Sequence, residues 1–139
     1  MYKNILLAVD GSEHSLRSTE EAIKLHDSSD DAHIDVVYVA DYDKAKYDVL
    51  HAHDKEELEA KRRKKLLPIE KMLKDNNVTH TYHLLHGDPG PTIVAFANKG
   101  NYDLLVIGSR GLSKFQKMVL GSVSHKVVKQ ANCPVFVVK

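Results

Sequence analysis

Three glycines in the last third of the chain have the spacing of an anion-binding loop. Gly108 and Gly111 follow the apolar run at residues 104–107, and nine residues then separate Gly111 from Gly121, which directly precedes Ser122. Glycine lets the backbone turn sharply and approach a ligand closely, because it carries no Cβ. A helix that begins after Gly121 would offer a phosphate its unpaired amide groups and the positive end of its dipole. The expected chemistry is therefore the binding of a phosphate group.

Two common phosphate-binding motifs do not have this spacing. A P-loop requires Lys and then Ser or Thr after its second glycine, but Leu112 and Ser113 follow Gly111. The chain also lacks the G-x-G-x-x-G pattern, so neither a Walker NTPase nor an ordinary dinucleotide-binding protein is predicted. Ser122 and Ser124 would add hydroxyl donors to the loop. The alternative is that these glycines only form turns.

Five apolar runs are the strands that must position this loop. They occupy residues 5–9, 34–40, 79–85, 104–107 and 135–138. The first, fourth and fifth runs are almost continuously apolar, which is typical of parallel strands that helices cover on both faces. Such strands need helical crossovers between them.

Four segments between these runs are predicted to be helices: apolar residues recur at helical spacing in the first two, and capping residues stand at the starts of the first and third. They cover residues 13–26, 54–76, 89–98 and a stretch from 122 to a point before 132. Asp10 or Ser12 would cap the first helix, and Pro68 is expected to kink the second. Asp88 would cap the third, with Pro89 at its first helical position.

The alternation of strands and helices predicts an α/β fold. We expect residues 1–139 to form a single doubly wound, Rossmann-like domain with a five-stranded parallel sheet and four helices. The expected strand order, counted along the chain, is 3-2-1-4-5. Ligands of such sheets bind beyond the carboxyl ends of the strands, where the strand order reverses. The loops after residues 5–9 and 104–107 leave the sheet at that point.

The glycine spacing resembles the G-2x-G-9x-G(S/T) signature of the ATP-binding branch of the universal stress protein family. In this chain the signature reads Gly108-x2-Gly111-x9-Gly121-Ser122. Segments similar to the family also occur as LLAVDGS at residues 6–12, VVYV at 36–39, GDP at 87–89 and NCPV at 132–135. The resemblance therefore extends over nearly the whole chain. It implies the adenine nucleotide alpha hydrolase-like form of the Rossmann-like fold.

The same resemblance implies an adenine nucleotide site. Ala8, Val9 and Asp10 would flank the base and ribose, and Val39 would contact the adenine. The ribose and phosphates would lie among the residues of the glycine loop, which are Gly108, Ser109, Arg110, Gly111, Gly121, Ser122, Val123 and Ser124. ATP is the implied cofactor, with Mg²⁺ or Mn²⁺ bound through its phosphates. Ala8 departs from relatives that carry proline there. Asp10 has two roles that can coexist, which are contact with the sugar or a bound cation and capping of the first helix.

The resemblance further implies a cytoplasmic stress-response regulator or protective factor that binds ATP and acts as a homodimer. The last strand, Val135–Val138, would pair with a second copy in antiparallel fashion, because an exposed apolar edge needs cover. Two alternatives stay open: a slow metal-dependent ATPase or autokinase, and a ligand-free protein-interaction module. No residue is marked as a catalytic base or water-positioning group, so no dedicated catalysis is expected.

Composition argues against several other functions. The chain has 139 residues, with 20 Lys and Arg against 19 Asp and Glu, so its net charge of +1 gives no pull toward nucleic acid or an anionic membrane. The early apolar run at residues 5–9 is far shorter than the roughly 20 residues that cross a bilayer. A single cysteine, Cys133, cannot form an internal disulfide, which fits the cytoplasm. It is expected to be a buried small residue.

The histidines and the main basic run are not expected to form sites. His83 would point to the opposite face of its strand from His80 and His86, because side chains alternate along a strand. No metal site is therefore predicted. The basic run at residues 61–65 follows several glutamates on a predicted helix and is interpreted as a solvated helix surface.

Overall fold

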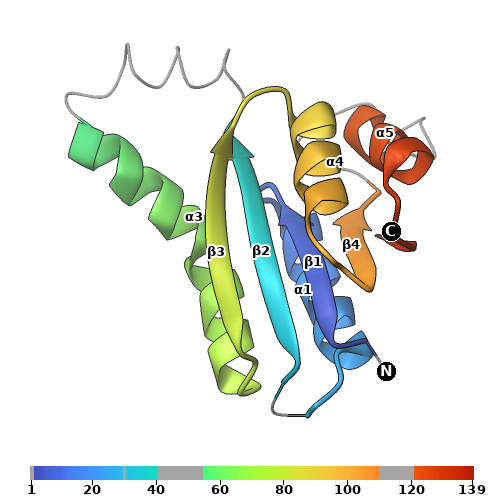
Figure 1. Ribbon diagram of the computed structural model, residues 1–139. Coiled ribbons are helices and arrows are strands. Elements are labelled where there is room, and N and C mark those ends of the chain that lie inside the picture. Colours follow the sequence, from blue (N-terminus) through green and yellow to red (C-terminus); the bar gives the residue numbers. More distant parts are fainter. Residues whose placement is uncertain (1, 30, 41–54, 110–120) are drawn as a thin grey trace.

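The computed structural model describes residues 2–29, 31–40, 55–109 and 121–139. Within them, strands and helices alternate along the chain (Figure 1). The elements are β1 (Asn4–Val9), α1 (Glu13–Leu25), β2 (His33–Ala40), α3 (Lys55–Asp75), β3 (His80–His86), α4 (Pro89–Lys99), β4 (Leu104–Gly108), α5 (Ser122–Gln130) and β5 (Val135–Val138). The predicted alternation is confirmed, and each bound agrees with its predicted range to within one residue.

The five strands pair in parallel, in the order β3-β2-β1-β4-β5. This is the predicted order, and it places β1 at the centre, between β2 and β4. β1 and β4 are buried along almost their whole length, as their continuous apolar runs predicted.

β5 does not fit the same expectation. It lies at the edge of the sheet, as the predicted strand order requires, but its four apolar residues predicted a strand covered on both faces and only Val138 among them is buried. The side chain of Phe136 is 39% exposed. The prediction was wrong because an apolar run of four residues has the same composition at an edge as at the centre of a sheet.

Helices cover both faces of the sheet (Figure 1). α1 and α3 pack against the face that carries Ile5, Leu7 and Val9 of β1. α4 and α5 pack against the face that carries Leu6 and Ala8. The helices contribute the apolar residues of their inner sides, which include Leu16, Ala22, Ile69, Leu73, Ile93, Val94, Ala97 and Val127. Both cores therefore depend on the alternation of side chains along the central strand.

The helix ends follow the predicted capping residues. Ser12 is the N-cap of α1, and Asp88 is the N-cap of α4 with Pro89 at the first helical position, although neither N-cap side chain forms a capping hydrogen bond. α3 continues through Pro68 as one helix. In the part of the chain that the structure describes, none of the helices combines the length and apolarity needed to cross a membrane.

Candidate functional site

The carboxyl ends of the neighbouring strands β1 and β4 lie side by side where the strands end. Ala8 stands opposite Ile107 in the register of these two strands. On the other side of β1, Val9 stands opposite Tyr38 of β2. β1 therefore has β2 on one side and β4 on the other, and the strand order reverses at this point as predicted.

Two backbone hydrogen bonds hold the ends of the glycine loop at these strand ends. The N–H of Gly121 donates to the carbonyl oxygen of Ser109 over 2.7 Å, and the N–H of Ser109 donates to the carbonyl oxygen of Val138 over 2.7 Å. Ser109 itself is only 3% exposed. We call the bond between the first pair the Ser109–Gly121 clasp. It brings the start of α5 to the end of β4, although residues 110–120 separate them in the chain.

Ser124 joins α5 to the end of β4. Its hydroxyl donates a 2.6 Å hydrogen bond to the carbonyl oxygen of Gly108, and the residue is only 3% exposed. A serine hydroxyl has one hydrogen to donate. In this arrangement Ser124 can offer a ligand its backbone N–H but not its hydroxyl hydrogen. Ser122, by contrast, is exposed at the first position of the helix.

The first turn of α5 leaves backbone amides without partners inside the helix. Gly121 is the N-cap, and its carbonyl oxygen accepts the N–H of His125 over 2.9 Å. The N–H groups of Ser122, Val123 and Ser124 precede this first intrahelical bond. Among the described residues, 110–120 being outside them, no side-chain capping hydrogen bond is found at this end of the helix. Together with the helix dipole, these three amides form an arrangement that suits a phosphate group.

Asp10 organises the turn that leads from β1 into α1. Its Oδ1 atom accepts hydrogen bonds from the N–H of Ser12 (2.9 Å), the hydroxyl of Ser12 (2.5 Å) and the hydroxyl of Ser15 (2.8 Å). The N–H of Asp10 in turn donates to Oγ of Ser15 over 2.9 Å. These bonds order the turn before α1, but of the two predicted capping residues it is Ser12 that occupies the N-cap position. The contact of Asp10 with a sugar or a cation stays a prediction.

The three apolar residues predicted to line the base do not all share one face. Ala8 is 5% exposed and packs in the core under α4 and α5, and Val39 packs against the same core. Val9 belongs to the opposite core, under α1 and α3. Ala8 and Val39 can therefore line a base together from that side, whereas Val9 would contribute from its backbone or from the other face.

Gly11 and Lys65 meet beside the end of β1. Gly11 has a φ of +81°, a conformation that favours glycine, and a Cβ atom added to it would lie 3.2 Å from Cβ of Lys65. The stem of this exposed lysine therefore runs along the loop that follows Asp10. The sequence analysis placed Lys65 on a solvated surface. Nothing in its local pattern says which side of α3 faces the β1 loop.

Two predicted site residues, Arg110 and Gly111, lie outside the described residues. Among the residues that are described, no group of three His, Cys, Asp or Glu is arranged to hold a metal ion. As predicted, His83 lies on the face of α4, with its ring 4.9 Å from that of Phe96, while His80 lies 5.3 Å from the ring of Tyr82. Tyr82 packs against the opposite core.

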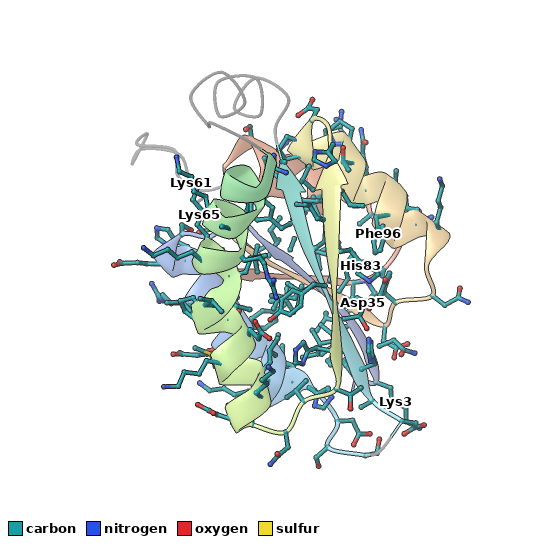
Figure 2. All side chains as sticks on the ribbon, turned by 90° about the vertical axis from the view of Figure 1, so that its left-hand side faces the viewer. Lys3, Asp35, Lys61, Lys65, His83 and Phe96 are labelled. Atoms are coloured by element: carbon teal, nitrogen blue, oxygen red, sulfur yellow. The ribbon has the colours of Figure 1, made fainter. Side chains whose placement is uncertain are left out.

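A second polar group, which we call the Asp35 cluster, lies on the α4 face away from the glycine loop. Oδ1 of Asp35 lies 3.1 Å from Nε2 of both His33 and His83, and Oδ2 accepts the hydroxyl of Tyr102 over 2.8 Å. Figure 2 shows Asp35 and His83 close to Phe96 of α4. The sequence analysis missed this cluster, because Asp35 and Tyr102 lie 67 positions apart and the members belong to no motif.

Cys133 and the basic run at residues 61–65 are the two features that the sequence analysis did not expect to form sites. Cys133, which was expected to be buried, is only partly buried against the core under α4 and α5, and this burial raises the pKa of its thiol, which disfavours the nucleophilic thiolate. In the basic run, Lys61, Arg63, Lys64 and Lys65 are exposed, as expected for a solvated helix surface.

The chain is similar to known proteins over its whole length. A sequence profile of the universal stress protein family matches residues 1–139. The universal stress protein MJ0531 of Methanocaldococcus jannaschii is 33% identical over 146 residues, which cover 100% of this chain and 83% of that protein. The solved structure of MJ0577, from the same organism, superposes with a TM-score of 0.84 at 27% identity, covering 100% of this chain and 96% of that one.

Two further structures share the fold at lower identity. A universal stress protein solved in complex with cAMP has a TM-score of 0.69 and 22% identity, covering 99% of this chain and 96% of that one. The Arabidopsis thaliana protein At3g01520, solved with AMP bound, has a TM-score of 0.65 and 19% identity, covering 99% and 91%. Taken with the match of the family profile to all 139 residues, the shared sheet order and the spaced glycines, the comparisons establish that this chain belongs to the universal stress protein family.

Proposed function

We propose that residues 1–139 act as one ATP-binding domain, which serves as a homodimeric, cytoplasmic stress-response regulator or protective factor. The observation that carries the nucleotide site is the Ser109–Gly121 clasp. It sets the first amides of α5, which have no partner inside the helix, next to the end of β4 and beside the end of β1. A polyphosphate placed there would receive several charge-assisted hydrogen bonds without any movement of the sheet.

In this proposal each part of the nucleotide has its own residues. The base lies by Ala8 and Val39, and the ribose by Val9 and Asp10. The phosphates lie along the glycine loop, where the proposed contacts are Gly108, Ser109, Arg110, Gly111, Gly121, Ser122, Val123 and Ser124. Ser124 acts through its backbone N–H, because its hydroxyl hydrogen is already donated to Gly108. A divalent cation would bind through the phosphates.

Proteins of the same fold support an adenine nucleotide as the ligand. Two of them were solved with cAMP and with AMP. Both ligands carry adenine, ribose and a phosphate, which are the three groups that the proposed residues would contact. The proposed cytoplasmic location is supported by the single cysteine, Cys133, because disulfides are rare in that compartment.

The nucleotide proposal is tested by two measurements on the purified protein. Mass spectrometry after denaturation is expected to find released adenine nucleotide, and calorimetry is expected to show ATP binding that Gly121→Val abolishes, because the valine side chain fills the space beside the clasp. Ala95→Val, which places the same isopropyl side chain on the exposed side of α4, is the control. Unaltered ATP binding in Gly121→Val, with both variants folded, contradicts the proposed site.

The homodimer is proposed to form through β5. The carbonyl groups of Pro134 and Val138 accept hydrogen bonds from β4, so by the alternation along a strand Val135 and Val137 present their backbone groups to the open edge. Phe136 is 39% exposed on the same strand. An apolar edge with free backbone groups is stabilised by pairing with a second copy in antiparallel fashion.

Light scattering after gel filtration tests this pairing. Wild-type protein is expected to elute as a dimer, and Val137→Pro as a monomer, because proline removes the outward N–H and leaves the bonds to β4 in place. Val137→Thr keeps that N–H and is expected to remain dimeric. A monomeric wild-type protein at micromolar concentration, or a dimeric Val137→Pro variant, contradicts the pairing.

A further inference from the structure

Lys65 is a cation held next to the proposed nucleotide site by the backbone of Gly11. Its Cβ, Cγ and Cδ atoms all lie within 3.7 Å of the position that a Cβ of Gly11 would occupy. Gly11 is the residue after Asp10, at the end of the central strand. The stem of Lys65 is therefore fixed along the β1 loop, although its side chain is exposed.

No carboxylate neutralises Lys65 within its own helix. The residues three and four positions away are Arg62, Pro68, Lys61 and Ile69. Lys61 and Lys65 stand four positions apart on one side of α3, a spacing at which like charges repel. Lys74 of the same helix, in contrast, pairs with Glu70 over 2.9 Å. Lys65 forms no ion pair with a residue whose side chain the structure describes.

The position of Lys65 suits an anion at the carboxyl edge of the sheet. Figure 2 shows Lys61 and Lys65 on the half of α3 that lies toward the carboxyl ends of β2 and β3. The register pairs Ala8 of β1 with Ile107 of β4, so Asp10 and Ser109, each two positions further on, leave the sheet from neighbouring strands. α3 covers the opposite face of the sheet from α5, so Lys65 and the amides of α5 flank the end of β1 from its two sides. A phosphate chain that starts at the amides of α5 and crosses the end of β1 would extend toward the ammonium group.

We propose that Lys65 is the specificity-determining residue that makes this site prefer a nucleoside triphosphate to a monophosphate. The inference rests on the proposed nucleotide-binding function and adds a residue from α3 to it. The amides of α5 hold the phosphate nearest the ribose, which ATP and AMP share. The ammonium group of Lys65 contacts the outer phosphates, which only ATP has, so its charge contributes to the affinity for ATP alone.

The test compares ATP and AMP by calorimetry on the full chain. Lys65→Met keeps an apolar stem against Gly11 and removes the charge, and it is expected to weaken ATP binding about tenfold while AMP binding changes less than twofold. Lys65→Arg keeps a positive charge and is expected to retain most of the preference for ATP. Lys71→Met removes the same charge from an exposed position six residues along the helix and is the matched control.

The outcomes separate this inference from the function on which it rests. If Lys65→Met changes ATP and AMP binding equally, or changes neither, the inference is wrong while the nucleotide site stands. An equal effect of Lys71→Met also overturns it, because general charge would then explain the preference. If the wild-type protein binds neither nucleotide, the proposed function and this inference both fail. Thermal unfolding of each variant verifies that it is folded.

Discussion

The hydroxyl of Tyr102 donates a 2.8 Å hydrogen bond to Oδ2 of Asp35. Tyr102 precedes β4, whereas Asp35 lies in β2, so the bond ties the segment after α4 to a strand two places away in the sheet. Burial, and then the neighbouring carboxylate, raise the pKa of Tyr102, so the hydroxyl keeps the proton that it donates. The ring also stacks on Phe96, with centroids 6.2 Å apart.

Replacing Tyr102 with Phe removes this hydrogen bond and keeps the ring. We expect the free energy of unfolding to fall by about 1 kcal/mol, which is below the usual range for a bond to a charged group because water can reach the partly exposed carboxylate. Urea unfolding measures the change. A loss of less than about 0.3 kcal/mol would show that water replaces the hydroxyl fully.

Asp35 also makes stability depend on pH. Burial by itself raises the pKa of Asp35, but the hydrogen bonds from Tyr102 and His83 and the charge of His33 outweigh it and hold the pKa below its ordinary value. A carboxyl with a lowered folded pKa contributes stability above its unfolded pKa, near 4, and this contribution is lost as the pH falls through the folded pKa. The Asp35→Asn variant is therefore expected to be less stable than wild type at pH 7.

A pH series on Asp35→Asn shows in which direction the stabilisation by Asp35 changes with pH. The difference in unfolding free energy between wild type and Asp35→Asn is expected to shrink as the pH is lowered from about 5 toward 3. Asp31→Asn, at an exposed carboxyl paired with Lys3, serves as the control and is expected to change stability little. A difference for Asp35→Asn that grows with acidification would contradict the interpretation.

Ser124 is expected to matter for stability more than its neighbour Ser122. Ser124→Ala leaves the carbonyl oxygen of Gly108 without its 2.6 Å hydrogen bond at a buried position, which is expected to cost about 1 to 2 kcal/mol. Ser122→Ala, at an exposed position, is expected to change stability by less than about 0.5 kcal/mol. Thermal unfolding of the two variants measures the difference. Equal effects of the two substitutions would show that the hydrogen bond from Ser124 to Gly108 does not stabilise the protein.

Gly11 and Gly90 are expected to respond oppositely to alanine. Gly11→Ala forces a side chain into a φ of +81° and against Lys65, which is expected to destabilise the protein by about 1 to 2 kcal/mol. Gly90 lies in α4 and a Cβ there meets Lys126 only at 3.4 Å, an ordinary contact. Gly90→Ala is therefore expected to be neutral or to stabilise by up to about 1 kcal/mol. Chemical unfolding of both variants tests this contrast.

Gly100 is expected to tolerate alanine poorly for a different reason. Its φ is −88°, which any residue adopts, but an added Cβ would overlap the ring of Tyr102. The ring would have to shift away from Asp35, so Gly100→Ala is expected to cost about 1 to 3 kcal/mol. In the Tyr102→Phe background the cost is expected to be smaller. Equal costs in the two backgrounds would mean that the bond to Asp35 does not restrain the ring.

The sequence predicted the framework of the fold because the framework depends on local signals. Apolar runs gave the strands, and Ser12, Asp88 and Pro89 stand at the predicted starts of helices. The glycine spacing and the family resemblance located the loop, and the structure brings Ser109 and Gly121 together there. These features need only information from a few neighbouring positions.

The remaining features depend on contacts between distant segments. Nothing near Ser124 in the sequence says that its hydroxyl is donated to Gly108, and no motif joins Asp35 to Tyr102. The approach of Lys65 to Gly11 depends on which side of α3 faces the sheet, which a run of five basic residues does not indicate. Such contacts arise from the packing of finished elements.

The two borders of the sheet differ in a way that limits how many copies can assemble. β5 ends the sheet with Val, Phe, Val and Val, whereas β3 ends it with a strand that carries three histidines and a threonine. If two copies join through their β5 strands, the wholly apolar borders pair with each other and the histidine-bearing borders remain at the two ends of the joined sheet. Growth then stops at a closed pair, and the chain avoids the open-ended stacking of sheets that leads to fibres.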